Sequence, residues 1–264
     1  MNLSKLVAQD VPLFLSLISD LFPGLGVPEG MAHTDLKAAL DAITERENLL
    51  LHPSWSIKVI QLYETSLVRH GIMVVGPPGA GKSRIISCLQ DSLTTTTGIQ
   101  HKRIRMNPKA IRAEEMFGET DKATQEWVDG IFATMWAKFN DRNRKDIQWI
   151  VCDGPVDALW IENLNTVLDD NKILTLANGD RIPMTDNVKL IFEVEDLRNA
   201  SPATVSRAGI IFVSESDLDW EPFYKSWLKK KPNNQVETFS EVFEKYIGTC
   251  EGPKAFGKLF QYVI

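Results

Sequence analysis

The stretch from Gly76 to Ser83 constrains this chain more than any other, because it fits the pattern G-x-x-x-x-G-K-[ST]. Glycines in such a loop let backbone N–H groups turn inward around a phosphate chain, and the lysine then reaches the terminal phosphates. The serine hydroxyl is placed to hold Mg²⁺. The members of the loop are Gly76, Pro77, Pro78, Gly79, Ala80, Gly81, Lys82 and Ser83.

The residues on either side of the loop have the setting that this chemistry needs. An apolar run, Ile72 to Val75, precedes it, and Ile85, Ile86 and Leu89 follow at helical spacing. This order predicts a buried strand, a turn and a helix. The alternative interpretation is a glycine-rich turn that binds nothing. We expect the loop to bind ATP together with Mg²⁺.

Composition excludes some other classes of function. The 35 acidic and 29 basic residues give a net charge of −6, which argues against a nucleic-acid partner for the whole surface. Cys88, Cys152 and Cys250 form no C-x-x-C pair, so they suggest neither a metal site nor a disulfide framework. We expect a reducing compartment. The apolar run from Val11 to Phe22 contains Asp20 and is too short to cross a membrane. We therefore expect a soluble chain with no membrane partner.

With 264 residues and 44% hydrophobic content, the chain can bury a real core. We expect an α/β fold, with a mostly parallel sheet sandwiched by helices. Residues 1–33 read as a connector or docking segment, residues 34–218 as a large α/β nucleotide-binding subdomain, and residues 219–264 as the start of a helical small subdomain.

Strand and helix patterns alternate through the large subdomain. Strands are expected at 72–75, 103–106, 149–153, 188–192 and 210–213, and hairpins at 118–130 and 173–184. Helices are expected from Val11 to Phe22, from Thr34, after Pro53, after the loop, around an interrupted segment at 110–140, from Val156 to Leu168, from Ser201-Pro202 to Arg207, and after Trp220. Thr94 to Thr97 reads as a polar turn that closes the helix after the loop.

Asp153 ends an apolar strand, where a P-loop protein needs a carboxylate for the Mg²⁺ bound by Ser83. The alternative is an ordinary turn aspartate, since Asp-Gly is a common turn pair. In ATPases of this architecture a glutamate that activates the attacking water usually comes next, and here the residue is Gly154. A missing general base costs about 10²–10⁴-fold in rate. Asp157 and Glu162 could substitute only by reaching back along the chain.

Several runs together resemble the second AAA+ module of dynein heavy chains, so the resemblance implies a P-loop AAA+ fold. These runs are WIVCDGPVD at 149–157, WIENLNTVLDDNK at 160–172, IFEVEDL at 191–197 and SPATVSRAG at 201–209, with further likeness at 10–24 and 58–71. The likeness spans nearly the whole chain. The residues in these runs are more similar to those of axonemal than of cytoplasmic dyneins.

The resemblance implies a fragment of a microtubule motor, with the cytoskeleton and the ciliary or flagellar axoneme as its location. Its partners would be neighbouring AAA+ modules and the linker of the same heavy chain, with microtubules contacted only by the whole motor. The second module of that family holds ATP with little or no turnover, which agrees with Gly154. Glu193 and Glu195 stand where active sites often carry a sensor asparagine.

The resemblance also assigns roles that spacing cannot. Arg207 occupies the position of an arginine finger that would enter the nucleotide site of the preceding module; the alternative is a cation on the helix dipole. The hairpins at 118–130 and 173–184 resemble inserts that meet the linker, or else they are exposed hairpins without partners. The sequence ends at Ile264, early in the small subdomain, so we expect part of the nucleotide lid to be missing.

Two other functions compete with this prediction. One is a hydrolytically competent, stand-alone P-loop ATPase, which Gly154 disfavours. The other is an interaction domain with an empty pocket, which is disfavoured because Gly76, Gly81, Lys82, Ser83 and Asp153 all remain.

Overall fold

The computed structural model describes residues 3–7, 9–24, 33–214, 217 and 220–246, and its centre is a five-stranded sheet in the order β2-β5-β8-β1-β9. Every pairing within this sheet is parallel. Its strands are β1 (Gly71–Val75), β2 (His101–Met106), β5 (Ile147–Asp153), β8 (Val188–Val194) and β9 (Gly209–Phe212). The predicted α/β fold is confirmed, with each predicted strand of the sheet present.

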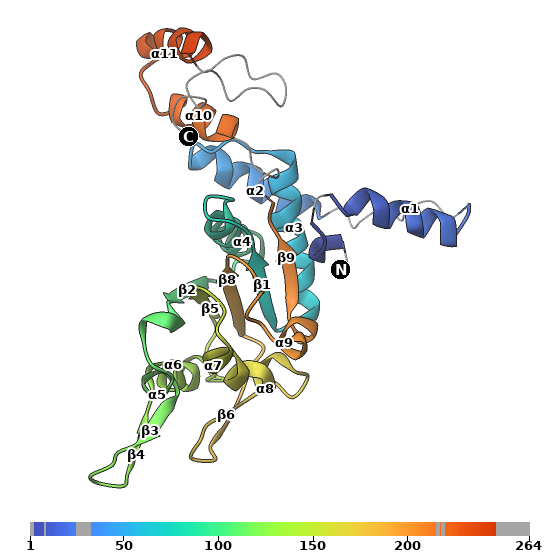
Figure 1. Cartoon of the computed structure of the whole chain (residues 1–264). Helices are drawn as coiled ribbons and strands as arrows, with labels where there is room; N and C mark the ends of the chain where they lie inside the picture. Colours follow the sequence, from blue (N-terminus) through green and yellow to red (C-terminus); the bar gives the residue numbers. More distant parts are fainter. Residues whose placement is uncertain (1–2, 8, 25–32, 215–216, 218–219, 247–264) are drawn as a thin grey trace.

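Helices cover both faces of the sheet (Figure 1). The α-helices are α1 (Val11–Leu21), α2 (Thr34–Arg46), α3 (Pro53–Val68), α4 (Lys82–Thr97), α5 (Ala113–Phe117), α6 (Ile131–Phe139), α7 (Ala158–Ile161), α8 (Asn165–Leu168), α9 (Pro202–Arg207), α10 (Trp220–Leu228) and α11 (Asn233–Tyr246). Short 3-10 helices are η1 (Leu3–Lys5), η2 (Pro108–Ala110) and η3 (Glu162–Leu164).

The strand before the loop has side chains buried on both faces, as parallel strands between helices require. Met73 and Val75 of β1 lie in one core cluster, which includes Phe132 and Trp136 of α6. Ile72 and Val74 lie in the other, which is built by helices α2, α3 and α4. The two clusters hold β1 and the start of α4 in a fixed relation, and this relation positions the loop between them.

Two hairpins leave the sheet at the same end of the molecule (Figure 1). One pairs β3 (Gly118–Thr120) with β4 (Trp127–Asp129), and the other pairs β6 (Ile173–Thr175) with β7 (Arg181–Pro183). Both were predicted from their turn residues. Gly179 takes φ +91° between β6 and β7, a conformation that glycine adopts without strain.

The prediction of a polar turn at Thr94–Thr97 is wrong, because α4 continues through Thr97 and ends at Gly98. Each threonine hydroxyl in this run donates a hydrogen bond to the carbonyl oxygen four residues earlier. Such bonds satisfy the hydroxyl inside the helix. A run of threonines therefore does not end a helix whose other face is buried.

The single helix expected from Val156 to Leu168 is also corrected, since the chain forms α7, η3 and α8 in succession. At its break, the Asn165 side chain accepts a hydrogen bond of 2.9 Å from the Thr204 hydroxyl of α9. Asparagine has a low helix propensity and competes for such contacts. Apolar spacing predicted the buried face correctly but not the continuity of the backbone.

The two ends of the described chain extend from the sheet. No residue of α1 is buried, and Leu13, Leu17 and Leu21 are all more than half exposed. Residues 25–32 of the expected connector segment lie outside the described residues, as does everything after Tyr246. Among the helices that the structure describes, none is both long enough and apolar enough to cross a membrane.

Candidate nucleotide-binding site

The loop between β1 and α4 forms because its glycines permit close backbone approaches. A Cβ on Gly76 would lie 2.2 Å from the Val213 carbonyl oxygen, so no larger residue fits there. Gly79 has φ +82° and Gly81 has φ +87°, both in the left-handed region. The chain thus turns sharply from β1 into the N-terminus of α4, where backbone N–H groups and the helix dipole favour anions.

Lys82 is held inside the loop. Its ammonium group donates to the carbonyl oxygens of Gly76 at 2.7 Å and Pro77 at 2.8 Å. Desolvation by burial lowers the pKa of Lys82, and the nearby carboxylates of Glu193 and Asp153 oppose this shift. The amine is therefore a partly desolvated cation that contacts the loop's own carbonyl groups.

Four side chains from four different elements meet beside the loop. The Ser83 hydroxyl of α4 donates to Glu193 Oε1 of β8. Arg105 of β2 donates to Glu193 Oε2 at 3.0 Å and pairs with Asp153 Oδ2 of β5 at 3.3 Å. Asp153 and Glu193 are register partners on adjacent strands, so their backbones place the two carboxylates next to each other.

Ser83, Arg105 and Glu193 line a cavity of about 580 Å³ at the carboxyl ends of the strands. Ligands in open parallel α/β sheets bind at this edge. The cavity is lined by Glu47, Gly79, Gly81, Lys82, Ser83, Arg84, Ser87, Gln90, Asp91, Arg103, Arg105 and Glu193. Four of these side chains are lysine or arginine, which suits a polyphosphate.

The oxygen atoms at this site fit Mg²⁺. Hydroxyl and carboxylate oxygens are the donors that this hard cation prefers, and Ser83 and Asp153 supply one of each next to Glu193. Mg²⁺ uses one or two protein carboxylates together with substrate phosphates. A fully protein-made cage is therefore not needed.

An apolar pocket of about 300 Å³ adjoins the charged cavity and shares Gly81 and Arg84 with it. Leu49, Leu50 and Trp55 form one side, and Phe223 and Trp227 of α10 form the other. The backbone N–H of Leu50 donates to the Ser226 hydroxyl at 3.0 Å, which connects α10 to the segment between α2 and α3. This pocket has the size and lining that suit a planar base next to a phosphate site.

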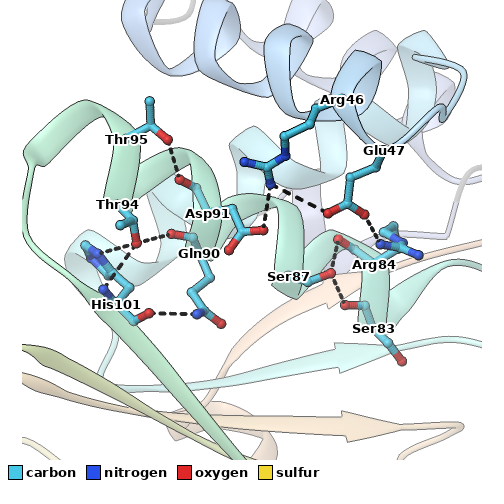
Figure 2. A network of polar contacts seen from close by, with 10 residues as sticks. All are labelled: Arg46, Glu47, Ser83, Arg84, Ser87, Gln90, Asp91, Thr94, Thr95 and His101. Carbon is cyan, nitrogen blue, oxygen red and sulfur yellow. Dashed lines mark hydrogen bonds and ion pairs between the residues drawn. The ribbon is translucent and has the colours of Figure 1, made fainter.

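Figure 2 shows how α4 is anchored to α2 beside this junction. Glu47, at the end of α2, pairs with Arg84 of α4, and Arg46 reaches both Glu47 and Asp91 at 3.6 Å. Further along α4, the Gln90 amide donates to the carbonyl oxygen of His101 at 2.7 Å. These contacts fix α4 at both its α2 and β2 sides.

Gly154 is enclosed by its neighbour Asn107. A Cβ added at Gly154 would lie 2.7 Å from Asn107 Oδ1, which itself accepts from the backbone N–H of Lys109. The two substitute bases considered from the sequence do not join the cluster: Asp157 pairs with Lys109 at 3.4 Å, and Glu162 is exposed on η3. In the described chain, no carboxylate follows Asp153 directly.

Arg207 lies far from the loop. It ends α9, which begins with Ser201 accepting a hydrogen bond from the backbone N–H of Thr204. Gly209 pairs with Ile72 at the amino end of β1, whereas the loop leaves β1 after Val75. Arg207 therefore lies at the amino ends of the strands, opposite the loop, where it pairs with Asp169 at 3.5 Å.

Sequence reasoning missed Arg105 and the contact between Ser83 and Glu193. Arg105 belongs to the strand predicted at 103–106, where the alternation of arginine with apolar residues indicates a half-buried strand but no site. The strand lies at the sheet edge next to β5, so its last residues reach the same edge as Asp153. Parallel strand order, which one sequence does not reveal, brings these residues together.

A phosphate-binding loop on an inner strand of a parallel, helix-covered sheet defines a P-loop nucleotide-binding domain. The family model for the AAA domain of the dynein-related subfamily matches residues 71–208, and the model for the hydrolytic ATP binding site of the dynein motor region matches residues 1–83. The chain therefore belongs to the dynein-related AAA family and corresponds to part of the AAA motor region of axonemal dynein heavy chains.

Individual relatives agree with this assignment. The chain is 54% identical over 245 residues to dynein axonemal heavy chain 8 of Mus musculus, covering 93% of this chain and 5% of that protein. It is 57% identical over 247 residues to the dynein gamma chain of the flagellar outer arm of Chlamydomonas reinhardtii, covering 94% and 5%. Dynein axonemal heavy chain 5 of Rattus norvegicus is 51% identical over 243 residues, with coverage of 92% and 7%. The chain thus spans a small part of these relatives.

Proposed function

We propose that this chain is the second AAA+ module of a dynein motor in the ciliary or flagellar axoneme, and that it binds Mg-ATP with little or no hydrolysis. The observation that carries the proposal is the convergence of Lys82, Ser83, Arg105 and Glu193 on one cavity at the carboxyl edge of the sheet. The runs that resemble the second module support its place in the ring.

Each part of the cavity has a task in binding. The N–H groups of the loop and the start of α4 hold the phosphate chain, and Lys82 neutralises its terminal part. Ser83 and Asp153 hold Mg²⁺, which offsets phosphate charge when bound. The apolar pocket between Trp55 and Trp227 receives the base. The loop, the Mg²⁺ ligands and the apolar pocket thus contact three different parts of the nucleotide.

The weak point for hydrolysis is the residue after Asp153. Gly154 has no side chain to take a proton from water. Glu193 is held within the cluster by Ser83 through one carboxylate oxygen and by Arg105 through the other. A general base must be free to reach the attacking water. The missing side chain at position 154 supports the proposal of binding with little or no turnover.

The competing function is a hydrolysing ATPase, and one observation favours it. The model that matches residues 1–83 is described as a hydrolytic ATP binding site. That match ends at Ser83, so it does not extend to Asp153 or Gly154, where the carboxylate for water would stand. We therefore keep turnover as the alternative and test it separately from binding.

Calorimetry with Lys82→Ala tests binding. We expect the wild-type chain to bind Mg-ATP and the variant to lose it, because no other lysine of the described chain lines the cavity. Lys37→Ala, an exposed lysine on α2, is the matched control and should bind like wild type. Equal affinity of wild type and Lys82→Ala would overturn the nucleotide site.

Phosphate release tests turnover. We expect negligible release from the wild-type chain, since it lacks the base at 154 and a neighbouring arginine. Steady release that Lys82→Ala abolishes would establish the competing function. Release that survives Lys82→Ala would come from a contaminant.

Partners in the motor follow from the same proposal. Arg207 acts in trans on the preceding module, which its position at the far edge of the sheet supports. The β3–β4 and β6–β7 hairpins contact the linker, since both extend from one end of the molecule (Figure 1). Microtubules are bound by the complete motor.

A further inference from the structure

We propose that Glu193 positions the Mg²⁺ ligand Ser83 and thereby sets how strongly ATP binding depends on Mg²⁺. This inference rests on the proposed nucleotide site and adds to it a residue that the phosphate-loop motif does not contain. Glu193 acts through Ser83; it is a positioning residue and not a catalytic one.

The burial of Glu193 supports its role as a fixed partner of Ser83. Its side chain is 8% exposed, whereas that of Asp153 is 42% exposed. A buried carboxylate must be paired and hydrogen-bonded, because desolvation costs it more than an exposed one. Glu193 meets this need with one oxygen on Ser83 and the other on Arg105.

The direction of the hydrogen bond decides what Ser83 can do. A serine hydroxyl has one proton and two lone pairs. Because the proton is donated to Glu193, both lone pairs remain for a cation. The Ser83 oxygen is thus presented as an acceptor at the start of α4, next to Lys82.

Arg105 makes this arrangement specific to a carboxylate. The guanidinium can only donate, so whatever faces it at position 193 must accept. In a Glu193→Gln variant the amide oxygen turns to Arg105 and the amide NH₂ turns to Ser83. The hydrogen bond to Ser83 is then reversed, and one Ser83 lone pair is consumed by the NH₂ group.

Asp153 does not duplicate this role. Its nearest charged partner in the described chain is Arg105, at 3.3 Å, and the Ser83 hydroxyl bonds to Glu193 instead. The register places Asp153 one strand further from β1, since β8 lies between β5 and β1. Asp153 therefore faces the cation site from the solvent side, while Glu193 supports the serine from within.

The test measures ATP affinity by calorimetry of the 264-residue chain, once in Mg²⁺ and once in EDTA. Partners that orient a metal ligand typically change metal affinity by about 10–100-fold when they are replaced. We expect Glu193→Gln to reduce the ratio of the Mg²⁺ to the EDTA affinity by at least about tenfold. Asp196→Asn, the same charge change at the same end of β8, should leave the ratio unchanged; its side chain pairs with Arg198.

A double-mutant cycle with Ser83→Ala separates action through the serine from a general charge effect. If Glu193 acts through Ser83, the double variant has the ratio of Ser83→Ala alone, since the two changes remove one interaction. Independent, additive losses would overturn the proposal. An unchanged ratio in Glu193→Gln would overturn it as well.

Glu193→Asp covers the case in which Glu193→Gln fails to fold. It keeps the charge but is one methylene shorter, so its carboxylate no longer reaches Ser83, and the ratio should fall; an unchanged ratio contradicts the proposal. If the wild-type chain bound no ATP, the proposed nucleotide site itself would be wrong. The two failures are therefore distinguishable.

Discussion

The two ends of the central strands carry arginines in contrasting surroundings. At the carboxyl ends, Arg105 joins two carboxylates on adjacent strands beside the loop. At the amino ends, Arg207 has Asp169 as its ion pair, and both side chains are more than a third exposed. The first end joins residues of several strands within this chain, whereas the second carries one partly exposed ion pair. If the proposed function holds, the first end can be studied in the isolated chain, whereas the role of Arg207 can be tested only in a motor that contains a neighbouring module.

The largest effect is expected from Arg207→Ala in a complete motor. Arginine fingers contribute roughly 10³–10⁵-fold to phosphoryl transfer. We expect ATP turnover to fall by about that factor, with ATP binding at Lys82 unchanged. Turnover and microtubule gliding of the purified motor measure it.

Asp169→Ala is the matched control, because it removes the ion pair at 3.5 Å and leaves the guanidinium. It should keep near wild-type turnover. If Arg207→Ala lost only a little thermal stability, Arg207 would be a cation on the helix dipole, worth about 0.3–1 kcal/mol, and the contrast between the two ends would disappear.

Gly154→Glu tests the carboxyl end for hydrolysis. The new Cβ would lie 2.7 Å from Asn107 Oδ1, so we expect a loss of about 1–3 kcal/mol in the free energy of unfolding. Turnover of the isolated chain should stay negligible, because no neighbour supplies an arginine. Denaturant melts and phosphate release measure the two quantities.

Asn107→Ala combined with Gly154→Glu serves as the check on the cause. Removing the obstructing oxygen should recover part of the stability, so the two changes should be non-additive. Full additivity would mean that the contact with Asn107 is not what excludes a side chain at 154.

Ser201→Ala tests the stability of α9, the helix that ends at Arg207. The Ser201 hydroxyl caps α9 by accepting from the backbone N–H of Thr204, and loss of such a cap costs about 1 kcal/mol. ATP affinity should not change. Ser206→Ala, an exposed serine of the same helix, should stay within about 0.5 kcal/mol, and an equal loss there would contradict the capping role.

Thr95→Ala gives the smallest effect and touches neither end. Thr95 is exposed in the last turns of α4, and alanine has the higher helix propensity. We expect a gain of about 0.5 kcal/mol in thermal or denaturant melts, with unchanged ATP affinity. A loss of stability would show that the hydrogen bond from the Thr95 hydroxyl to Asp91 outweighs the higher helix propensity of alanine.

Much of the carboxyl end could be predicted from sequence because its determinants are local. The loop, its flanking strand and the helix after it are contiguous from Gly71 to Thr97. Asp153 was also placed correctly at a strand end. Patterns of this kind depend on residues that are neighbours in the chain.

The rest depends on strand order and on contacts across the sheet. Arg105 meets Glu193 across 88 positions of sequence, and Ser83 meets Glu193 across 110. The turn predicted at Thr94–Thr97 is wrong because α4 has a buried face, which includes Leu89 and Leu93 and holds the helix together beyond the local preference of the threonines. Tertiary burial overrode local preference there.

The tight approach of Gly76 to Val213 has a mechanical consequence. β9 runs from just after Arg207 to just before Val213, whose backbone N–H donates to Val75 at 2.7 Å and whose carbonyl leaves no room for a Cβ on Gly76. The strand is paired along its length with β1. β9 therefore connects the segment that carries Arg207 directly to the phosphate loop, so a shift of this strand along β1 would have to displace both.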